Sequence, residues 1–301
     1  MMKTATFKRI VQSLAALGLV LSGASAFAAS TTWGFGNASN CTEVKGTGSV
    51  TDTVGTTVYT GTYGNSWTCN TQALNTDPDV TVTAWSTTGS GGAFAKAWLP
   101  IWSGGGFGVV NGTTADTGAP NHAIDNNGET DLIFLNFGNY TVDLDIVKLG
   151  YTKTDADISI FRYVGVTPTV AGATVGNLKS TDTASGWQLV GNYADVAAST
   201  NKAVNTANST SSWWLISAYN ANYGTAISDN GTVNSCTPVG TATTCTQPTS
   251  NLQAGNDYFK LLSVAGTATK RTDVPEPTSL ALLGLGLIGI VGARRRKQSS
   301  M

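Results

Sequence analysis

Short runs of β-branched and aromatic residues, at intervals of about ten to twenty residues, are the feature that most restricts how this chain can fold. Residues 80–85 alternate apolar and polar side chains with a period of two, which is typical of a half-buried strand. Residues 131–137 are mostly apolar and predict a central strand that is buried on both faces. Apart from the N-terminal segment, only residues 280–293 resemble a helix. Strands without helices between them predict an all-β fold, an antiparallel β-sandwich of a jelly-roll-like kind.

The strand pattern recurs along most of the chain between its two ends. Val142, Leu144 and Ile146 are expected to face inward from one of these strands, because alternate residues share a face, and Leu149 is expected to face inward as well. The predicted strands cover residues 50–63, 80–85, 94–102, 131–137, 142–151, 158–163, 187–190, 212–219 and 258–264, and the polar segments 104–130 and 221–256 are expected to be loops.

The first 28 residues have the composition of a secretory signal peptide. A basic start is followed by an apolar stretch at 10–21 and by Ala26-Phe27-Ala28, whose small residues suit signal peptidase. We expect cleavage after Ala28, with cleavage after Ala26 as the alternative. The chain is therefore expected to be exported.

The last 28 residues combine a short motif, an apolar run and a basic end. The apolar residues 280–293 are few for a bilayer span and include several glycines, so they predict a single short transmembrane helix of low stability. The basic end should remain on the cytoplasmic side. The motif is Val274, Pro275, Glu276 and Pro277, and the basic end is Arg294, Arg295, Arg296 and Lys297.

This three-part tail resembles the PEP-CTERM sorting signal. The resemblance implies processing by an exosortase, a membrane protease that cuts near Pro275-Glu276-Pro277. It also implies a Gram-negative bacterium that makes extracellular polysaccharide, and only a transient stay in the inner membrane. A plain C-terminal membrane anchor is the alternative, whereas a GPI signal fits less well because such tails do not end in basic residues.

The two terminal signals divide the chain into four parts. Residues 1–28 form the signal peptide, 29–264 the extracellular β-sandwich, 265–273 a linker and 274–301 the sorting signal. Between the signals, ten basic and seventeen acidic residues give a formal charge of −7. An acidic body argues against nucleic acids and anionic membrane surfaces as partners.

Four cysteines lie in the exported body: Cys41, Cys69, Cys236 and Cys245. An even number of cysteines in an oxidising compartment predicts disulfides, and two disulfides can be paired in three ways. Proximity in the sequence favours Cys41–Cys69 and Cys236–Cys245. Zinc binding is the competing interpretation, but the spacing lacks a CxxC pair.

One loop has the side chains of a candidate calcium site: Asp125, Asn127, Glu129 and Asp131 alternate around Gly128. Hard oxygen ligands on a glycine-containing loop are what calcium prefers, although the spacing is not that of an EF-hand. The alternative is a plain hairpin turn at Asn127-Gly128. No other cofactor is expected.

Evidence for catalysis is weak. His122 is the single histidine, and the chain has no Gly-x-Ser-x-Gly motif to accompany it. Asp155 and Asp157 form a pair two residues apart, which we interpret as the solvated entry to a strand rather than as a glycosidase pair. We therefore expect no enzymatic activity.

Tryptophans offer a route to polysaccharide binding, because indole rings stack on sugars. Trp98 and Trp102 are four residues apart, and Trp213-Trp214 should point to opposite faces of a strand. The candidate carbohydrate-binding residues are Trp98, Trp102 and Trp214, and core packing is the alternative for each.

Residues 104–164 resemble a family of exosortase-dependent surface proteins. The resemblance rests on GGFGVVN at 105–111, PNH at 120–122, DNNG at 125–128, DLIFLNF at 131–137, LGY at 149–151 and DADISIFRY at 155–163. It implies sorting and location but no reaction. We therefore expect a non-enzymatic structural or adhesive protein of the cell surface or the biofilm matrix, associated with extracellular polysaccharide. The alternatives are a polysaccharide-binding module and a secreted glycan-acting enzyme.

Overall fold

A computed structural model describes most of the chain between the two predicted terminal signals. The described residues are 30–44, 50–54, 57–61, 64–71, 78–89, 91–111, 122–226, 229–230, 232–233, 251–253 and 257–271. The predicted signal peptide, Cys236, Cys245, the motif at 274–277, the apolar run at 280–293 and the basic end lie outside these residues.

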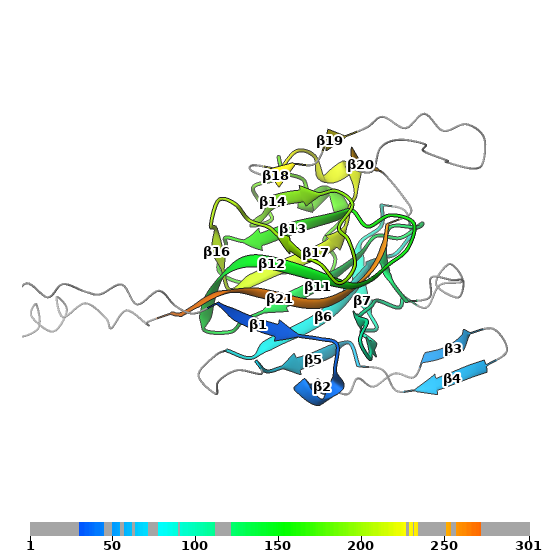
Figure 1. The fold of residues 1–301 in the computed structure, drawn as a ribbon. Helices are drawn as coiled ribbons and strands as arrows, with labels where there is room; N and C mark the ends of the chain where they lie inside the picture. Colours follow the sequence, from blue (N-terminus) through cyan, green and yellow to red (C-terminus); the bar gives the residue numbers. More distant parts are fainter. Residues whose placement is uncertain are drawn as a thin grey trace, which may run out of the picture.

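The first sheet is built around two long antiparallel strands, β12 and β21, which lie side by side in Figure 1. Both strands are thirteen residues long, and β1 and β10 pair with β21. The sheet consists of β1 (Thr31–Gly34), β8 (Ile101–Trp102), β9 (Gly106–Phe107), β10 (Ile124–Asp125), β12 (Tyr140–Thr152), β15 (Asn201–Ala203), β16 (Thr210–Ser211) and β21 (Tyr258–Lys270).

The second sheet has the order β18-β14-β13-β17-β11-β6-β5-β2, with β7 also paired to β6. Its pairings are antiparallel except that of β18 with β14. The strands are β2 (Cys41–Val44), β5 (Ser66–Cys69), β6 (Val80–Thr87), β7 (Phe94–Ala97), β11 (Asp131–Asn136), β13 (Ile158–Tyr163), β14 (Trp187–Tyr193), β17 (Trp213–Ala218) and β18 (Asp229–Asn230).

Within the described residues, four short strands form two separate ribbons, and three short 3-10 helices lie in the connections. The ribbons are the antiparallel pair of β3 (Val50–Val54) with β4 (Thr57–Gly61) and the parallel pair of β19 (Thr232–Val233) with β20 (Asn251–Leu252). The 3-10 helices are η1 (Ala38–Asn40), η3 (Val175–Leu178) and η4 (Ala221–Tyr223).

Both large sheets contribute side chains to one apolar core. Val142 and Val264 of the first sheet belong to the same buried cluster as Val82, Ile133 and Ile216 of the second. Burial of apolar side chains stabilises the fold by roughly 25 cal/mol per Å² of apolar surface removed from water. The prediction of an antiparallel all-β fold is therefore confirmed, while the jelly-roll-like winding stays a prediction.

The second sheet is covered on its other face as well. A second buried cluster contains Leu132, Phe161 and Leu215 of the sheet, packed with Val175 and Leu178 of η3. Neighbouring residues of β11 thus enter different clusters, Leu132 on one side and Ile133 on the other. The prediction that residues 131–137 form a strand buried on both faces is confirmed.

The inward face of β12 was predicted correctly for Val142, Leu144 and Leu149 but not for Ile146. Val142, Leu144, Val147 and Leu149 are buried, whereas Ile146 is only partly buried. The pairing with β21 shifts between Leu144 and Ile146, as at a β-bulge. An extra residue in one strand moves the following side chains to the opposite face, which is why the prediction for Ile146 was wrong.

Two predicted boundaries also differ from the structure. β21 continues to Lys270, so residues 265–270 belong to a core sheet and the predicted linker is wrong for them. The expected loops at 104–130 and 221–256 contain short strands, including β9, β10 and β20. Two-residue strands have no alternation long enough to be recognised in a sequence.

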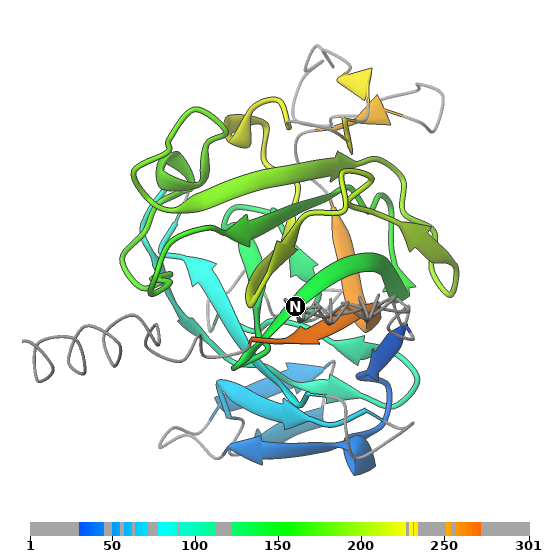
Figure 2. The same ribbon diagram turned by 90° about the vertical axis from the view of Figure 1, so that its left-hand side faces the viewer.

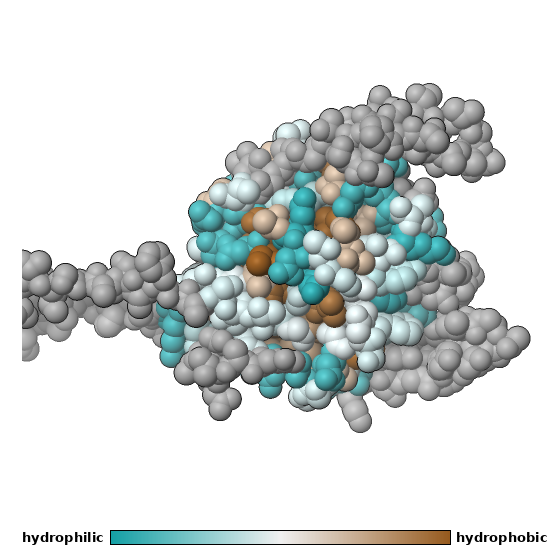
Figure 3. All heavy atoms as spheres, in the orientation of Figure 1, coloured by the Kyte–Doolittle hydropathy of each residue, from teal (hydrophilic) through white to brown (hydrophobic). Residues whose placement is uncertain are grey.

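Both ends of the described body leave from one side of the molecule. β1 pairs antiparallel with the last part of β21, and Thr31 lies opposite Gly266. Figures 1 and 2 show β1 beside β21. The face seen in Figure 3 is mainly hydrophilic, with separate small apolar patches. Within the described residues, no helix is long and apolar enough to span a bilayer.

Candidate functional site

The disulfide between Cys41 and Cys69 is present, as the sequence predicted. Cys41 of β2 and Cys69 of β5 lie directly opposite each other in the pairing of these strands, and their sulfurs are bonded. Both residues are buried in the core that the two sheets share. The second predicted pair, Cys236 and Cys245, lies outside the described residues.

The loop proposed for calcium is a bend between two sheets. Asn127 donates its backbone N–H to Asp125 Oδ1 at 3.0 Å, and Gly128 has a φ of 93° that favours glycine. The hairpin alternative is wrong, because β10 before the bend pairs with β21, whereas β11 after it pairs with β6 and β17. Asp131 is 1% exposed and Glu129 is partly buried. Calcium binding by these side chains stays a prediction.

Of the three candidate tryptophans, Trp214 does not have the exposure that sugar stacking needs. Its side chain is 0% exposed, and its indole N–H donates to the carbonyl oxygen of Ser211 at 3.1 Å. The choice of Trp214 for carbohydrate binding was therefore wrong. It is Trp213, its neighbour, that is partly exposed. Core packing decides which of the two faces outward.

Trp102 is 37% exposed but already has partners over its ring. The His122 ring stacks on it with centroids 5.8 Å apart, and Lys260 Nζ lies 4.6 Å from its centroid. Trp98 is partly buried and its backbone bonds to Val110 in both directions. Carbohydrate binding by Trp98 and Trp102 remains a prediction, and the structure gives Trp102 and His122 a packing role.

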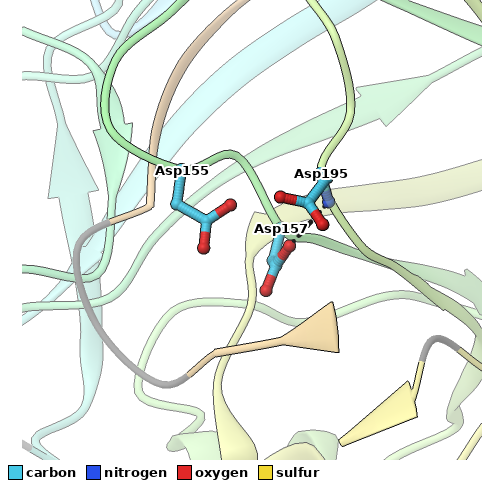
Figure 4. A group of neighbouring side chains, drawn as sticks. All are labelled: Asp155, Asp157 and Asp195. Atoms are coloured by element: carbon cyan, nitrogen blue, oxygen red, sulfur yellow. Dashed lines mark hydrogen bonds between the residues drawn. The ribbon is translucent and has the colours of Figure 1, made fainter. Parts of the chain in front are cut away.

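Three aspartates meet at the start of β13. Asp157 directly precedes this strand, Asp155 lies two residues earlier, and Asp195 follows β14, which pairs with β13. Their carboxylates point toward one another in Figure 4, with one oxygen of each lying within 4.8 Å of the others. Asp195 has a φ of 48°, a backbone conformation that short polar residues tolerate best.

Backbone N–H groups hold these carboxylates in place. Asp157 Oδ1 accepts a hydrogen bond from the Asp195 backbone N–H at 2.8 Å, which Figure 4 marks with a dashed line. Asp157 Oδ2 accepts from the Gln253 N–H at 2.6 Å. Asp155 Oδ1 accepts from the Ala156 N–H at 2.8 Å, while its buried Oδ2 makes no hydrogen bond within the described part of the chain.

A fourth aspartate, Asp257, joins this group to the loop after β10. Its Oδ1 accepts the backbone N–H of Asp157 at 2.8 Å, and its Oδ2 accepts a hydrogen bond from the Asn126 side chain. Asn126 in turn accepts the Asp257 backbone N–H at 3.0 Å and donates to the Tyr219 carbonyl at 2.6 Å. Asn126 lies between Asp125 and Asn127, so the residues predicted to bind calcium are close in sequence to a residue that contacts these aspartates but are not among the aspartates.

Burial raises the pKa of three of these carboxyl groups, those of Asp155, Asp157 and Asp257. Burial raises the pKa of Asp157 to about 7, against the effect of its two backbone hydrogen bonds, and the nearby charges of Asp155 and Asp195 raise it further. Burial, and after it the charge of Asp157, raises the pKa of Asp257 well above its usual value. Burial also raises the pKa of Asp155. The group can therefore retain protons at mildly acidic pH.

The sequence identified half of this group and assigned it the wrong environment. Asp157 was interpreted as solvated, but it is 0% exposed. Asp195 and Asp257 were missed because each is a single aspartate in a segment without a motif. Their position could have drawn attention to them, since each of the four aspartates lies close to the end of a strand.

Two kinds of chemistry suit these four aspartates, Asp155, Asp157, Asp195 and Asp257, which we call the acidic group. It can share protons among its carboxyl groups, or Asp155, Asp157 and Asp195 can hold a hard cation such as calcium. A pocket of about 170 Å³, lined by Asp155, Asp195 and Lys153 among others, opens beside it. The acidic group is therefore a candidate site for protons or for calcium.

The comparisons with known proteins concern the C-terminal tail. Residues 273–297 match the family model of the PEP-CTERM protein-sorting motif. No curated protein and no solved structure matches the chain. The motif marks an exported protein that is targeted to an exosortase. The chain thus carries a PEP-CTERM sorting signal, which implies membrane-associated sorting toward the cell surface.

Proposed function

We propose that this protein is a non-enzymatic structural or adhesive component of the cell surface or the extracellular polysaccharide matrix of a Gram-negative bacterium. The signal peptide directs export through signal peptidase, and residues 280–293 hold the chain in the inner membrane until an exosortase cuts near Pro275-Glu276-Pro277. One observation carries the proposal: a PEP-CTERM motif follows an all-β body closely.

The body has properties that suit a passive role outside the cell. A disulfide fastens β2 to β5 in the shared core, and disulfides persist in oxidising compartments. The formal charge of −7 for residues 29–273 favours solubility. The described candidates for acid–base chemistry, Asp157 and Asp257, are fully buried and hold backbone and side-chain N–H groups. This arrangement supports a structural role for them.

Processing is tested by replacing Pro275, Glu276 and Pro277 with alanine in the full chain. We expect the variant to accumulate at full length in the membrane fraction, because the exosortase no longer recognises it, while the unaltered chain is shortened and released. Immunoblots of membrane and extracellular fractions measure this. The matched control is Thr278→Ala with Ser279→Ala, which alters the tail outside the motif. Normal processing of the motif variant would sink the proposal.

A further inference from the structure

A second pocket lies at the end of the body where β21 finishes, near β16 on the left of Figure 1. It encloses about 330 Å³, within the range of roughly 300–1,000 Å³ that is typical of small-molecule sites. Its walls come from the start of β12, the end of β13, β16, the start of β17 and the residue after β21. Its main side chains are Thr141, Arg162, Tyr163, Ser211, Trp213 and Arg271.

The pocket gathers the arginines of the exported body. Between the signal peptide and the sorting tail the sequence has two arginines, Arg162 and Arg271, and both line this pocket although they are far apart in the chain. The body around them has an excess of acidic residues. Arginine offers a planar fork of N–H donors that matches the two oxygens of a carboxylate. Two such forks in one pocket define a local site for an anion.

Neutral groups hold Arg162 in position. Its Nε donates to Gln188 Oε1 at 2.7 Å, and its Nη1 donates to the Thr210 carbonyl at 3.3 Å. Arg162 is half-buried, and burial lowers the pKa of its guanidinium. No carboxylate of the described residues pairs with Arg162 or Arg271. The positive charge therefore remains available to a ligand.

Aromatic rings form the wall beside the two guanidinium groups. Trp213 and Tyr163 pack edge to face with centroids 5.8 Å apart, and the Arg271 guanidinium lies 5.9 Å from the Trp213 ring centroid. The Tyr163 hydroxyl donates to the Thr167 carbonyl at 2.6 Å, which fixes the orientation of its ring. A partly exposed indole is a surface on which the apolar face of a sugar ring can stack.

We propose that this pocket binds a carboxylate-bearing saccharide, a uronic acid unit of an acidic polysaccharide. Arg162 and Arg271 receive the carboxylate, Trp213 packs against the sugar ring, and hydroxyl groups such as that of Thr141 meet the sugar hydroxyls. This inference rests on the proposed role as a surface or matrix protein, and adds the chemical class of the polysaccharide that the protein would hold.

The first test measures binding of oligogalacturonate, a carboxylated saccharide, to the exported protein by calorimetry. Oligogalacturonate should bind, and neutral dextran fragments of similar length should not. Arg271→Gln should weaken oligogalacturonate binding about tenfold or more, because a charge-assisted hydrogen bond to the carboxylate is lost. The matched control is Lys96→Gln, which removes the same charge from an exposed position of β7 outside the pocket. Equal binding of dextran and oligogalacturonate would overturn the proposal.

Two further variants separate the contribution of side-chain shape to saccharide binding from the contribution of charge. Arg271→Lys keeps the charge but loses the planar fork, so it should bind more weakly than the unaltered protein and more tightly than Arg271→Gln. Trp213→Leu should weaken binding without a change in its salt dependence. Unchanged affinity in both Arg271→Gln and Trp213→Leu would exclude this pocket as the site.

Failure of this inference can be told apart from failure of the proposed function. Arg271→Gln should be exported and shortened normally, because the residue lies outside the sorting motif. Loss of saccharide binding with normal processing supports the pocket. Absence of binding in the unaltered, normally processed protein rejects the pocket alone. Processing of the Pro275-Glu276-Pro277 variant is measured independently of any saccharide.

Discussion

The acidity of Asp157 depends more on its burial than on its hydrogen bonds. Its pKa rises from 3.8 to about 7 in the folded protein, so between these pH values the folded state binds more protons than the unfolded chain. The contribution of Asp157 to stability is therefore fully present below about pH 4. It is lost as the pH rises toward 7. Without a bound cation, the protein should become less stable across that window.

Removing one charge from the acidic group should restore part of the stability that the protein loses as the pH rises toward 7. Asp195→Asn eliminates a neighbouring carboxylate that raises the pKa of Asp157, and asparagine tolerates the φ of 48° at this position. In the presence of a chelator at pH 7, we expect the free energy of unfolding to rise by about 1 kcal/mol. The gain should nearly vanish at pH 4. Thermal unfolding at both pH values measures it.

The control for this prediction is Asp79→Asn, which removes a charge from an exposed position. Calcium provides a second arm: if the group holds the ion, millimolar calcium should raise the melting temperature of the unaltered protein more than that of Asp195→Asn. An Asp195→Asn variant with equal effects at pH 4 and pH 7 would contradict the role assigned to the carboxylates.

Trp213 and Trp214 show what a sequence can and cannot predict for a single residue. That they face opposite ways follows from the period of a strand. Which one faces the core depends on the neighbouring strands: Trp214 lies between Leu135 of β11 and Arg162 of β13 in the sheet. Those partners are distant in sequence, so alternation alone left the choice open.

At the scale of elements, local sequence patterns predicted the positions of the strands well but not how the strands pair. The predicted runs at 80–85 and 158–163 are the strands β6 and β13. The alternation of apolar and polar residues carries no information about pairing partners or bulges, however. The register shift between Leu144 and Ile146 is the reason why Ile146 was wrongly predicted to face inward. The acidic group could not be assembled from sequence for the same reason, since Asp155, Asp195 and Asp257 reach it from separate segments.

The Cys41–Cys69 disulfide joins two neighbouring strands and closes a loop of 28 residues. Replacing both cysteines by alanine should lower the free energy of unfolding by about 3 kcal/mol, because the unfolded chain regains conformational freedom. Denaturant unfolding of the variant measures the loss.

Both cysteines are changed together so that no free thiol remains to form other bonds. The corresponding double variant at Cys236 and Cys245 is the comparison, and it should cost less because its loop would be shorter. An unfolding free energy that is unaltered in the Cys41 and Cys69 variant would show that strand pairing alone secures β2.

At the scale of the whole molecule, the structure describes the body, whereas the signal peptide and the membrane helix predicted at its two ends lie outside the described residues. The expected body, residues 29–264, differs from the observed one mainly in that β21 continues to Lys270. The first strand begins at Thr31, directly after the expected signal peptidase site. Little of the chain thus lies between the end of β21 and the sorting motif, whose match starts at residue 273.

The expected cleavages at the two ends predict which residues the mature protein contains. Mass spectrometry of the exported protein should find an N-terminus at Ala29 and a C-terminus close to Pro275-Glu276-Pro277. The mass should also be lower by two hydrogen atoms for each disulfide. A mature chain that retains residues 280–293 would indicate a permanent anchor instead of an exosortase substrate.

The pairing of β1 with the end of β21 has a consequence for biogenesis. The two ends of the body emerge next to each other, with Thr31 opposite Gly266. If the predicted signal peptide and the predicted membrane helix hold the chain at one membrane, the body can therefore complete its fold without passing either end through that membrane. Removal of the two tethers can occur in either order, since neither cleavage has to precede the formation of the first or the last strand.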